Sequence, residues 1–257
     1  MDRQTLHLWC AYPDDLLEEE AAQACLKLLT EEEQARVARF KFERHQRESL
    51  ATRALIRTAL SFYRPIPPRA WRFKTNEHGK PAVDNQSGQD PGLRFNVSNS
   101  VGLVVCLVAE GAEVGVDVEP FERAEQILRL APEVFSGVEQ AQLESLEDAA
   151  KEDRALSLWT LKESYIKARG MGLALPLDKF SFSFGSAEEI RLEIDPSLDD
   201  DGSRWRFCQL DYAGHRIAAM VEQAGAGELE VLKARPVLAP PVHVNTGGVT
   251  WFPRDGG

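Results

Sequence analysis

The sequence has 257 residues, 43% of them hydrophobic, and a formal net charge of −11 at pH 7. This length fits one large domain or two small ones, and the apolar content is sufficient for a sizeable core. The negative charge argues against a general nucleic-acid binder. No run of about 18 uncharged apolar residues occurs, so no membrane span is expected.

The cysteines and the N-terminal residues indicate the compartment. Cys10, Cys25, Cys106 and Cys208 are far apart and form no CxxC pair. The N-terminus has no hydrophobic signal region. Reduced thiols in a cytoplasmic protein are therefore expected.

The first part of the chain predicts one strand, then helices, then further strands. Residues 5–12 are apolar and alternating, as in a strand, and residues 18–29 predict a helix. Thr30 and Glu33 form a capping-box pattern for the helices that run toward Tyr63. A strand is expected around Phe73. Further extended residues lead to the apolar run at residues 101–109, which ends at the turn Glu110-Gly111.

The second part mixes strands and helices in the same way. We expect helices at residues 124–130, 136–146 and 153–169, with residues 148–153 as a charged connection. Strand-like runs lie at residues 114–119, 180–184, 190–194, 205–210, 216–221 and 229–232. From Ala234 onward Pro and Gly dominate, which predicts a loose tail. Strands and helices without strict βαβ alternation predict an α+β fold.

Two carboxylates share one predicted strand, Gly115-Val116-Asp117-Val118-Glu119-Pro120. In a strand Asp117 and Glu119 point to one side, which we expect to be exposed, and the valines to the other. A third carboxylate, Glu163, lies on the predicted helix with Lys167 one turn later. Glu163 and Lys167 alone could be an exposed ion pair, but three carboxylates together could form an oxygen-rich Mg²⁺ site.

The strand GVDVEP and the later stretch WTLKESYIKARGMGLALPLDKFSF together resemble the double signature of the 4′-phosphopantetheinyl transferases. The form with W-x-x-K-E-S-x-x-K is similar to the larger, surfactin-synthetase-activating type. The resemblance implies two similar α+β halves related by a pseudo-two-fold, with the active site and coenzyme A between them. It places the N-terminal half at residues 1–112, the C-terminal half with the signature at residues 113–233, and the tail at residues 234–257.

The resemblance also implies an activity of the holo-carrier-protein synthase type. Phosphopantetheine would move from coenzyme A to a serine of an acyl or peptidyl carrier protein, and 3′,5′-ADP would leave. Asp117, Glu119 and Glu163 match the magnesium ligands, and Lys167 would touch a phosphate. The proton acceptor could be Glu163 or a metal-bound water.

Coenzyme A contacts are implied for residues of the N-terminal half. They are Arg47, Arg53, Lys80, Pro81, Ser98 and Asn99. Asn99 stands where most relatives have histidine, and it could instead only shape a turn. Arg47 and Arg53 could instead belong to a solvated helix face, and Arg36 and Arg39 are interpreted in that way. Trp159 is interpreted as a residue of the core.

The expected partners are coenzyme A and a carrier protein, with neither nucleic acid nor membrane, and the protein is expected to be a monomer. Between Arg36 and Arg57 there are seven basic residues against two glutamates, which could receive phosphates or an acidic partner. Two rival functions remain. One is another Mg²⁺-dependent enzyme that cleaves phosphoanhydrides, and the other is a non-enzymatic module that binds carrier proteins or coenzyme A.

Overall fold

The chain forms two halves in sequence order, followed by a C-terminal pair of strands. The computed structural model describes residues 6–84, 92–185, 189–222, 229–234, 241–244 and 249–252. The first half contains β1 (Leu6–Ala11), α1 (Glu19–Leu26), α2 (Glu31–Ala38), α3 (Glu43–Tyr63), β2 (Phe73–Thr75), β3 (Pro81–Val83), β4 (Leu93–Ser100) and β5 (Leu103–Glu110).

The second half contains β6 (Val114–Pro120), α4 (Ala124–Arg129), α5 (Ala131–Val134), α6 (Gly137–Glu144), α7 (Asp148–Arg169), β7 (Phe180–Phe184), β8 (Ile190–Ile194), β9 (Trp205–Tyr212) and β10 (His215–Glu222). β11 (Leu229–Lys233) and β12 (Val242–Val244) follow. The α+β class expected from the sequence is confirmed.

Both halves have the same topology. In each, a first strand is followed by a long helix and then by a hairpin whose second strand pairs antiparallel with the first strand. The strand orders are β1-β5-β4 and β6-β10-β9. A small two-stranded sheet, β2-β3 or β7-β8, lies between the long helix and the hairpin in each half. The repeat is therefore topological, although the sequence itself shows no visible repeat.

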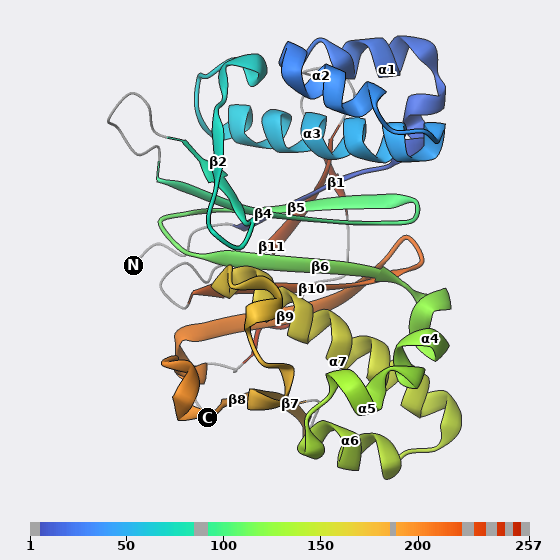
Figure 1. The fold of residues 1–257 in the computed structure, drawn as a ribbon, viewed down its shortest axis with the longest axis vertical. Coiled ribbons are helices and arrows are strands. Elements are labelled where there is room, and N and C mark those ends of the chain that lie inside the picture. Colours follow the sequence, from blue (N-terminus) through green and yellow to red (C-terminus); the bar gives the residue numbers. More distant parts are fainter. Residues whose placement is uncertain are drawn as a thin grey trace.

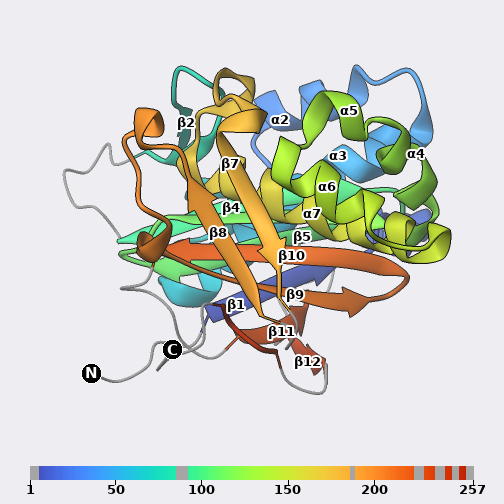
Figure 2. The same ribbon diagram turned by 90° about the horizontal axis from the view of Figure 1, so that it is seen from below.

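The two main sheets lie face to face between two helical layers (Figure 1). Helices α1 to α3 cover one outer face, and α4 to α7 cover the other. In Figure 2 the strands β7 and β8 cross over the strands β9 and β10. Residues of β7 and β8 pack in the same core as residues of α7. Residues of β1, β5, β6, β9 and β10 form a central core between the sheets.

Strand alternation decides which side of β6 carries the polar groups. Val116 and Val118 enter the central core between the sheets. Asp117 and Glu119 consequently point the other way, toward α7. Both side chains are buried, at 4% and 7% exposure. The prediction that this face of the strand is exposed is therefore wrong, because α7 covers β6.

Helix α7 is longer than the sequence indicated. Residues 148–153, predicted as a charged connection, form its first turns. Asp148 and Asp153 face solvent. Lys151 pairs with Asp148 at 3.6 Å, three residues earlier, and this arrangement supports a helix. The helix ends at Gly170, whose φ of 65° is the left-handed value expected for a C-cap.

The described part of the C-terminal tail is attached to the fold. β11 pairs parallel with β1, and β12 pairs with β11. Phe252 exchanges backbone hydrogen bonds with Phe207 of β9 at 2.8 and 2.7 Å, and its ring is buried in the core around α7. The expectation of a loose tail does not fit these residues, because an isolated apolar residue can anchor a segment without any periodic pattern. Residues 235–240, 245–248 and 253–257 lie outside the described residues.

Candidate active site

The carboxylate strand β6 and helix α7 approach each other closely at Gly115. A Cβ atom built on Gly115 would lie 2.0 Å from the backbone oxygen of Ser164 and 2.5 Å from the backbone nitrogen of Ala168. Only glycine therefore allows this contact. It brings the face of α7 that carries Glu163 and Lys167 next to Asp117 and Glu119.

Asp117 is held by two groups that the sequence had singled out separately. Its Oδ1 accepts hydrogen bonds from Lys167 Nζ at 2.6 Å and from Ser98 Oγ at 3.0 Å. Lys167 Nζ also donates to Ser98 Oγ at 2.8 Å. The structure thus brings one residue each from β4, β6 and α7 together. A buried carboxylate needs such a partner, because an isolated charge in the interior is very costly.

Glu119 is contacted by three residues that the sequence did not place here. Its Oε1 accepts from Arg123 Nη1 at 2.5 Å and from Trp159 Nε1 at 3.1 Å, and its Oε2 accepts from Ser100 Oγ at 3.4 Å. Trp159, interpreted as core packing, binds the carboxylate directly through its indole N–H. No sequence spacing indicated the contact with Arg123, because Glu119 lies in a strand and the i,i+4 rule applies within a helix.

The three carboxylates influence one another electrostatically. Burial and the charge of Asp117 raise the pKa of Glu163 to about 6, while Lys167 acts in the opposite direction. Burial and Asp117 also raise the pKa of Glu119, and Arg123 opposes this. A cluster of this kind gains from any additional cation, because a nearby positive charge favours the ionised form of each carboxylate.

The cluster has donor atoms that suit a hard divalent ion. Asp117 Oδ2 is buried and has no hydrogen-bond partner in the described structure. Carboxylate oxygens are the ligands that Mg²⁺ prefers. Within the described ranges, no three Asp, Glu, His or Cys side chains already converge as a metal site, and Lys167 and Arg123 pair with two of the carboxylates instead. The residue types and the orphaned oxygen fit Mg²⁺.

A large cavity lies in the N-terminal half, with a volume of about 1110 Å³. It is formed mainly by α2, α3 and the segment that includes β2. Its walls carry the basic residues Arg36, His45, Arg53, Arg57, Arg69, Arg72 and Lys74. The acidic residues Glu31, Glu32, Glu33 and Glu48 also line it. Ion pairs of Glu31, Glu32 and Glu33 with arginines neutralise three of these four.

The residues expected to contact coenzyme A fall into two groups. Arg53, Pro81 and Asn99 line the cavity. Arg47 and Lys80 do not, and Arg47 lies 4.0 Å from Glu43 on the same helix. Ser98 lies in the carboxylate cluster, one residue from Asn99.

Arg36 is exposed and pairs with Glu32 four residues earlier on the same helix, as the interpretation of a solvated helix face expected, and it also lines the cavity. Arg39, which received the same interpretation, is exposed.

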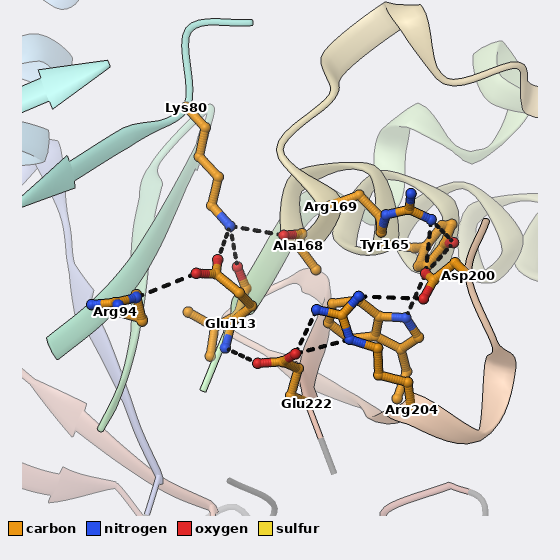
Figure 3. A network of polar contacts seen from close by, with 11 residues as sticks. Lys80, Arg94, Glu113, Tyr165, Ala168, Arg169, Asp200, Arg204 and Glu222 are labelled. Carbon is orange, nitrogen blue, oxygen red and sulfur yellow. Dashed lines mark hydrogen bonds and ion pairs between the residues drawn. The ribbon is translucent and has the colours of Figure 1, made fainter. Parts of the chain in front are cut away.

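Lys80 is fully engaged with protein groups (Figure 3). Its Nζ donates to Glu113 Oε2 at 2.8 Å, to the backbone oxygen of Ala168 at 2.8 Å and to that of Val114 at 3.3 Å. An ammonium group has three protons to donate. The side chain is 16% exposed.

A buried ion pair recurs at the same place in both halves. In α7, Lys162 donates to Glu139 at 2.8 Å and to the carbonyl oxygens of Leu177 and Phe180, both at 2.8 Å. Glu139 also closes the capping box at the start of α6. Lys162 therefore supports the helix next to Glu163.

In the first half Arg57 of α3 has the corresponding contacts. It lies 2.8 Å from Glu33, which closes the capping box of α2, and it donates to the carbonyl oxygens of Pro68 and Trp71. Each cation also lies over a phenylalanine ring, Phe73 in the first half and Phe180 in the second. The two halves thus share a buried ion pair at corresponding positions as well as a topology.

Comparisons with known proteins cover both halves. A sequence model of the 4′-phosphopantetheinyl transferase superfamily matches residues 113–220. A model described as 4′-phosphopantetheinyl transferase, N-terminal, matches residues 18–112. The two matched ranges adjoin between β5 and β6, where one half ends and the next begins.

Several characterised proteins are similar to this chain. The 4′-phosphopantetheinyl transferase HetI of Nostoc sp. is 31% identical over 225 residues, which cover 86% of this chain and 89% of that protein. The 4′-phosphopantetheinyl transferase Sfp of Bacillus subtilis is 28% identical over 192 residues, covering 75% and 83%. A holo-(acyl-carrier-protein) synthase from Bacillus anthracis, solved in complex with CoA (3′,5′-ADP), aligns with a TM-score of 0.37 and 15% identity, over 43% of this chain and 94% of that one.

Proposed function

This chain belongs to the 4′-phosphopantetheinyl transferase superfamily, and from that premise we propose which of its residues carry the reaction. The protein transfers phosphopantetheine from coenzyme A to a carrier protein. In this transfer a serine oxygen forms a bond to the β-phosphorus of coenzyme A. The bond from that phosphorus to the bridging oxygen breaks, 3′,5′-ADP leaves, and the serine proton passes to a base. Charge neutralisation and positioning supply most of the acceleration in such a step.

Asp117, Glu119 and Glu163 are the residues that would hold Mg²⁺. The orphaned Oδ2 of Asp117 and the raised pKa values of the other two carboxylates support this assignment. When bound, the ion would neutralise negative charge on the diphosphate. Lys167 lies one helical turn past Glu163 and already reaches the cluster. Its compact ammonium is suited to a phosphate oxygen.

The proton acceptor follows from the same assignment. Glu163 with a pKa of about 6 is ionised near neutral pH and could accept a proton. A cation on Glu163 pulls its pKa down and makes it a weaker base. We therefore assign Glu163 to ion binding and the serine proton to a water molecule.

The cavity of the N-terminal half would receive the nucleotide part of coenzyme A. Its volume of about 1110 Å³ is that of a large ligand site. Arg72 and Lys74 have no carboxylate partner among the described ion pairs, so their charge is available for phosphate. Asn99 lines this cavity, and its neighbour Ser98 contacts Asp117. These two adjacent residues would therefore lie between a nucleotide in the cavity and the carboxylate cluster.

The finer class we propose is a holo-carrier-protein synthase that acts as a monomer, because both halves of its site come from one chain. No helix among the described residues is long and apolar enough to cross a membrane. The four cysteines are free and buried, which supports a reducing, cytoplasmic location. The exposed basic residues outside the cavity, Arg39, Lys41 and Arg44, would face the acidic carrier protein.

The convergence of Asp117, Lys167 and Ser98 from three separate elements is the observation that carries this function. The test is mass spectrometry of an apo carrier protein mixed with the chain, coenzyme A and Mg²⁺. A gain of about 340 Da, the phosphopantetheine increment, is expected, and Asp117→Asn should abolish it. Hydrolysed coenzyme A beside an unmodified carrier would instead indicate a phosphoanhydride hydrolase, and no chemistry at all would indicate a binding module.

A further inference from the structure

Lys80 connects the two halves at the end of the helix that carries Glu163 and Lys167. The last carbonyl groups of a helix have no partner within it. In α7 the oxygen of Ala168 is one of these, and Lys80 donates to it at 2.8 Å. A positive charge at this end also interacts favourably with the helix dipole.

The loop that precedes Lys80 makes a second contact with the same helix end. Asn76 Nδ2 donates to the oxygen of the C-cap Gly170 at 2.7 Å. The same Asn76 shapes the loop, because its Oδ1 accepts from the backbone nitrogens of His78 and Lys80. A Cβ atom built on Gly170 would lie 2.8 Å from Lys80 Cδ, so the loop lies directly on the helix end.

Lys80 also reaches the first residues of the carboxylate strand. It donates to the oxygen of Val114 in β6 and to the side chain of Glu113. Glu113 is fixed in turn, because its backbone N–H donates to Glu222 at 2.8 Å and its carboxylate pairs with Arg94 at 3.3 Å. One ammonium group thus contacts both elements that bear the carboxylate cluster.

A chain of ion pairs continues from there back to α7 (Figure 3). Glu222 pairs with Arg204, Arg204 lies 3.4 Å from Asp200, and Asp200 binds Arg169 and Tyr165 of α7 at 2.8 Å. The helix end is therefore held from two sides.

We propose that Lys80 is a positioning residue, which fixes the coenzyme A cavity of the N-terminal half relative to α7 and β6, and not a direct contact of coenzyme A. The inference rests on the proposed function. Thr75 and Pro81, on either side of the loop, line the cavity, so the loop links the cavity wall to the elements that carry Asp117 and Glu163. All three protons of Lys80 are donated to protein oxygens, and the side chain lies outside the cavity lining.

This role has a kinetic consequence that a direct contact lacks. Misplacement of reacting groups by about 1 Å can cost about a hundredfold in rate. Loss of Lys80 should therefore lower kcat for transfer while the affinity for coenzyme A changes little. Loss of a direct phosphate contact would weaken binding instead.

The experiment compares Lys80→Met, Glu113→Gln and the double variant with wild type. Transfer kinetics, the calorimetric Kd for coenzyme A and amide hydrogen exchange are measured for each. Lys80→Met should lower kcat by about tenfold or more with a Kd within about threefold of wild type. Amide exchange should rise in residues 166–170 but not in α3. The double variant should lose little more than Lys80→Met alone, because both changes break the same contact.

The matched control is Lys179→Met, which removes an exposed lysine paired with Asp195 and should leave all three measurements unchanged. If Lys80→Met does not fold, Asn76→Ala removes the second contact on the helix end and must show the same exchange increase and a lowered kcat. A weakened Kd with kcat retained, additive effects of the two changes, or an unaltered helix end in Asn76→Ala would overturn the proposal. If wild type does not modify the carrier, the proposed function fails, whereas calorimetry and exchange still test Lys80.

Discussion

At the scale of single residues, the site consists of charges that are buried and then compensated. Asp117 is 4% exposed, and its charge is balanced by Lys167 at 2.6 Å. Glu119 is balanced in the same way by Arg123. Glu163 has no hydrogen-bond partner of this kind among the described contacts, and burial together with the charge of Asp117 raises its pKa to about 6. Glu163 should therefore respond to both pH and metal.

Glu163 should make the stability of the metal-free protein depend on pH. Burial and Asp117 raise its pKa from 4.5 to about 6, so the folded chain holds this proton more tightly than the unfolded chain does. The resulting stabilisation is complete below pH 4.5 and is lost as the pH rises through about 6. In EDTA, the free energy of unfolding of wild type minus that of Glu163→Gln should fall by about 1–2 kcal/mol across this window.

Urea unfolding at a series of pH values measures this difference. Addition of Mg²⁺ at neutral pH should raise the stability of wild type more than that of Glu163→Gln, because a ligand of the folded state stabilises it by mass action. Parallel pH profiles for the two proteins would contradict the assignment of a raised pKa to Glu163.

Asn99 should give coenzyme A binding a flat pH dependence. It lines the cavity and its side chain is exposed there. An asparagine donates hydrogen bonds to a phosphate but carries no charge. A histidine at this position has an ordinary pKa of about 6.5, which a neighbouring phosphate raises. Calorimetry from pH 6 to 8 should show tighter binding toward acid pH for Asn99→His than for wild type. Identical profiles, with Asn99→Ala binding as well as wild type, would leave Asn99 only a turn residue.

At the scale of elements, the close contact between β6 and α7 is possible because Gly115 has no side chain. Gly115→Ala would place a methyl group 2.0 Å from the backbone of Ser164, and backbone cannot rotate away as a side chain can. We expect a loss of about 3 kcal/mol in the free energy of unfolding, and slower transfer, because the strand and the helix separate. The control is Gly137→Ala at the start of α6, where an added Cβ meets nothing within 4 Å. Equal stability of the two variants would show that β6 and α7 do not pack as described.

The repeated ion pair also acts at this scale. Glu139→Gln leaves the ammonium of Lys162 buried without its counter-charge, at an expected loss of about 3–5 kcal/mol in urea unfolding. Adding Lys162→Met should recover part of this loss, since both charges are then gone. The exposed pair of Glu125 and Arg129 is the control, and Glu125→Gln should change stability by less than about 0.5 kcal/mol. Equal losses at the two sites would mean that Lys162 is solvated.

At the scale of the whole molecule, the C-terminal segment joins the two halves. β11 extends the sheet of the first half beside β1, while Phe252 pairs with β9 of the second half. The halves are also joined by their shared central core and by Lys80. The proposed binding of one coenzyme A across the cavity and the carboxylate cluster requires that the halves keep a fixed orientation.

Phe252 should therefore matter more for stability than its place near the end of the chain suggests. Its ring is 7% exposed and packs in the core around α7. Phe252→Ala should lower the free energy of unfolding by about 3 kcal/mol. Val242→Ala, at a residue of β12 that is 40% exposed, should cost less than about 0.5 kcal/mol. Thermal or urea unfolding distinguishes the two, and a neutral Phe252→Ala would indicate that the segment is not docked.

The sequence by itself determined the features that depend on local periodicity. Alternation in β6 placed Asp117 and Glu119 on one side, because a strand repeats every two residues. Helical spacing placed Glu163 and Lys167 together, and Thr30 with Glu33 formed the capping box as predicted. The strands β7 to β11 were also located, and the paired motifs identified the family. Each of these follows from neighbouring residues along the chain.

Only the tertiary structure decided which groups meet across long separations. Lys80 contacts Glu113 and Ala168, which are 33 and 88 residues away, and Trp159 binds Glu119 from 40 residues away. No periodic pattern encodes such partners, because burial and packing select them once the helices and strands are assembled. The pKa of Glu163 is decided in the same way, since it depends on the desolvation and the charges that folding brings around one carboxylate.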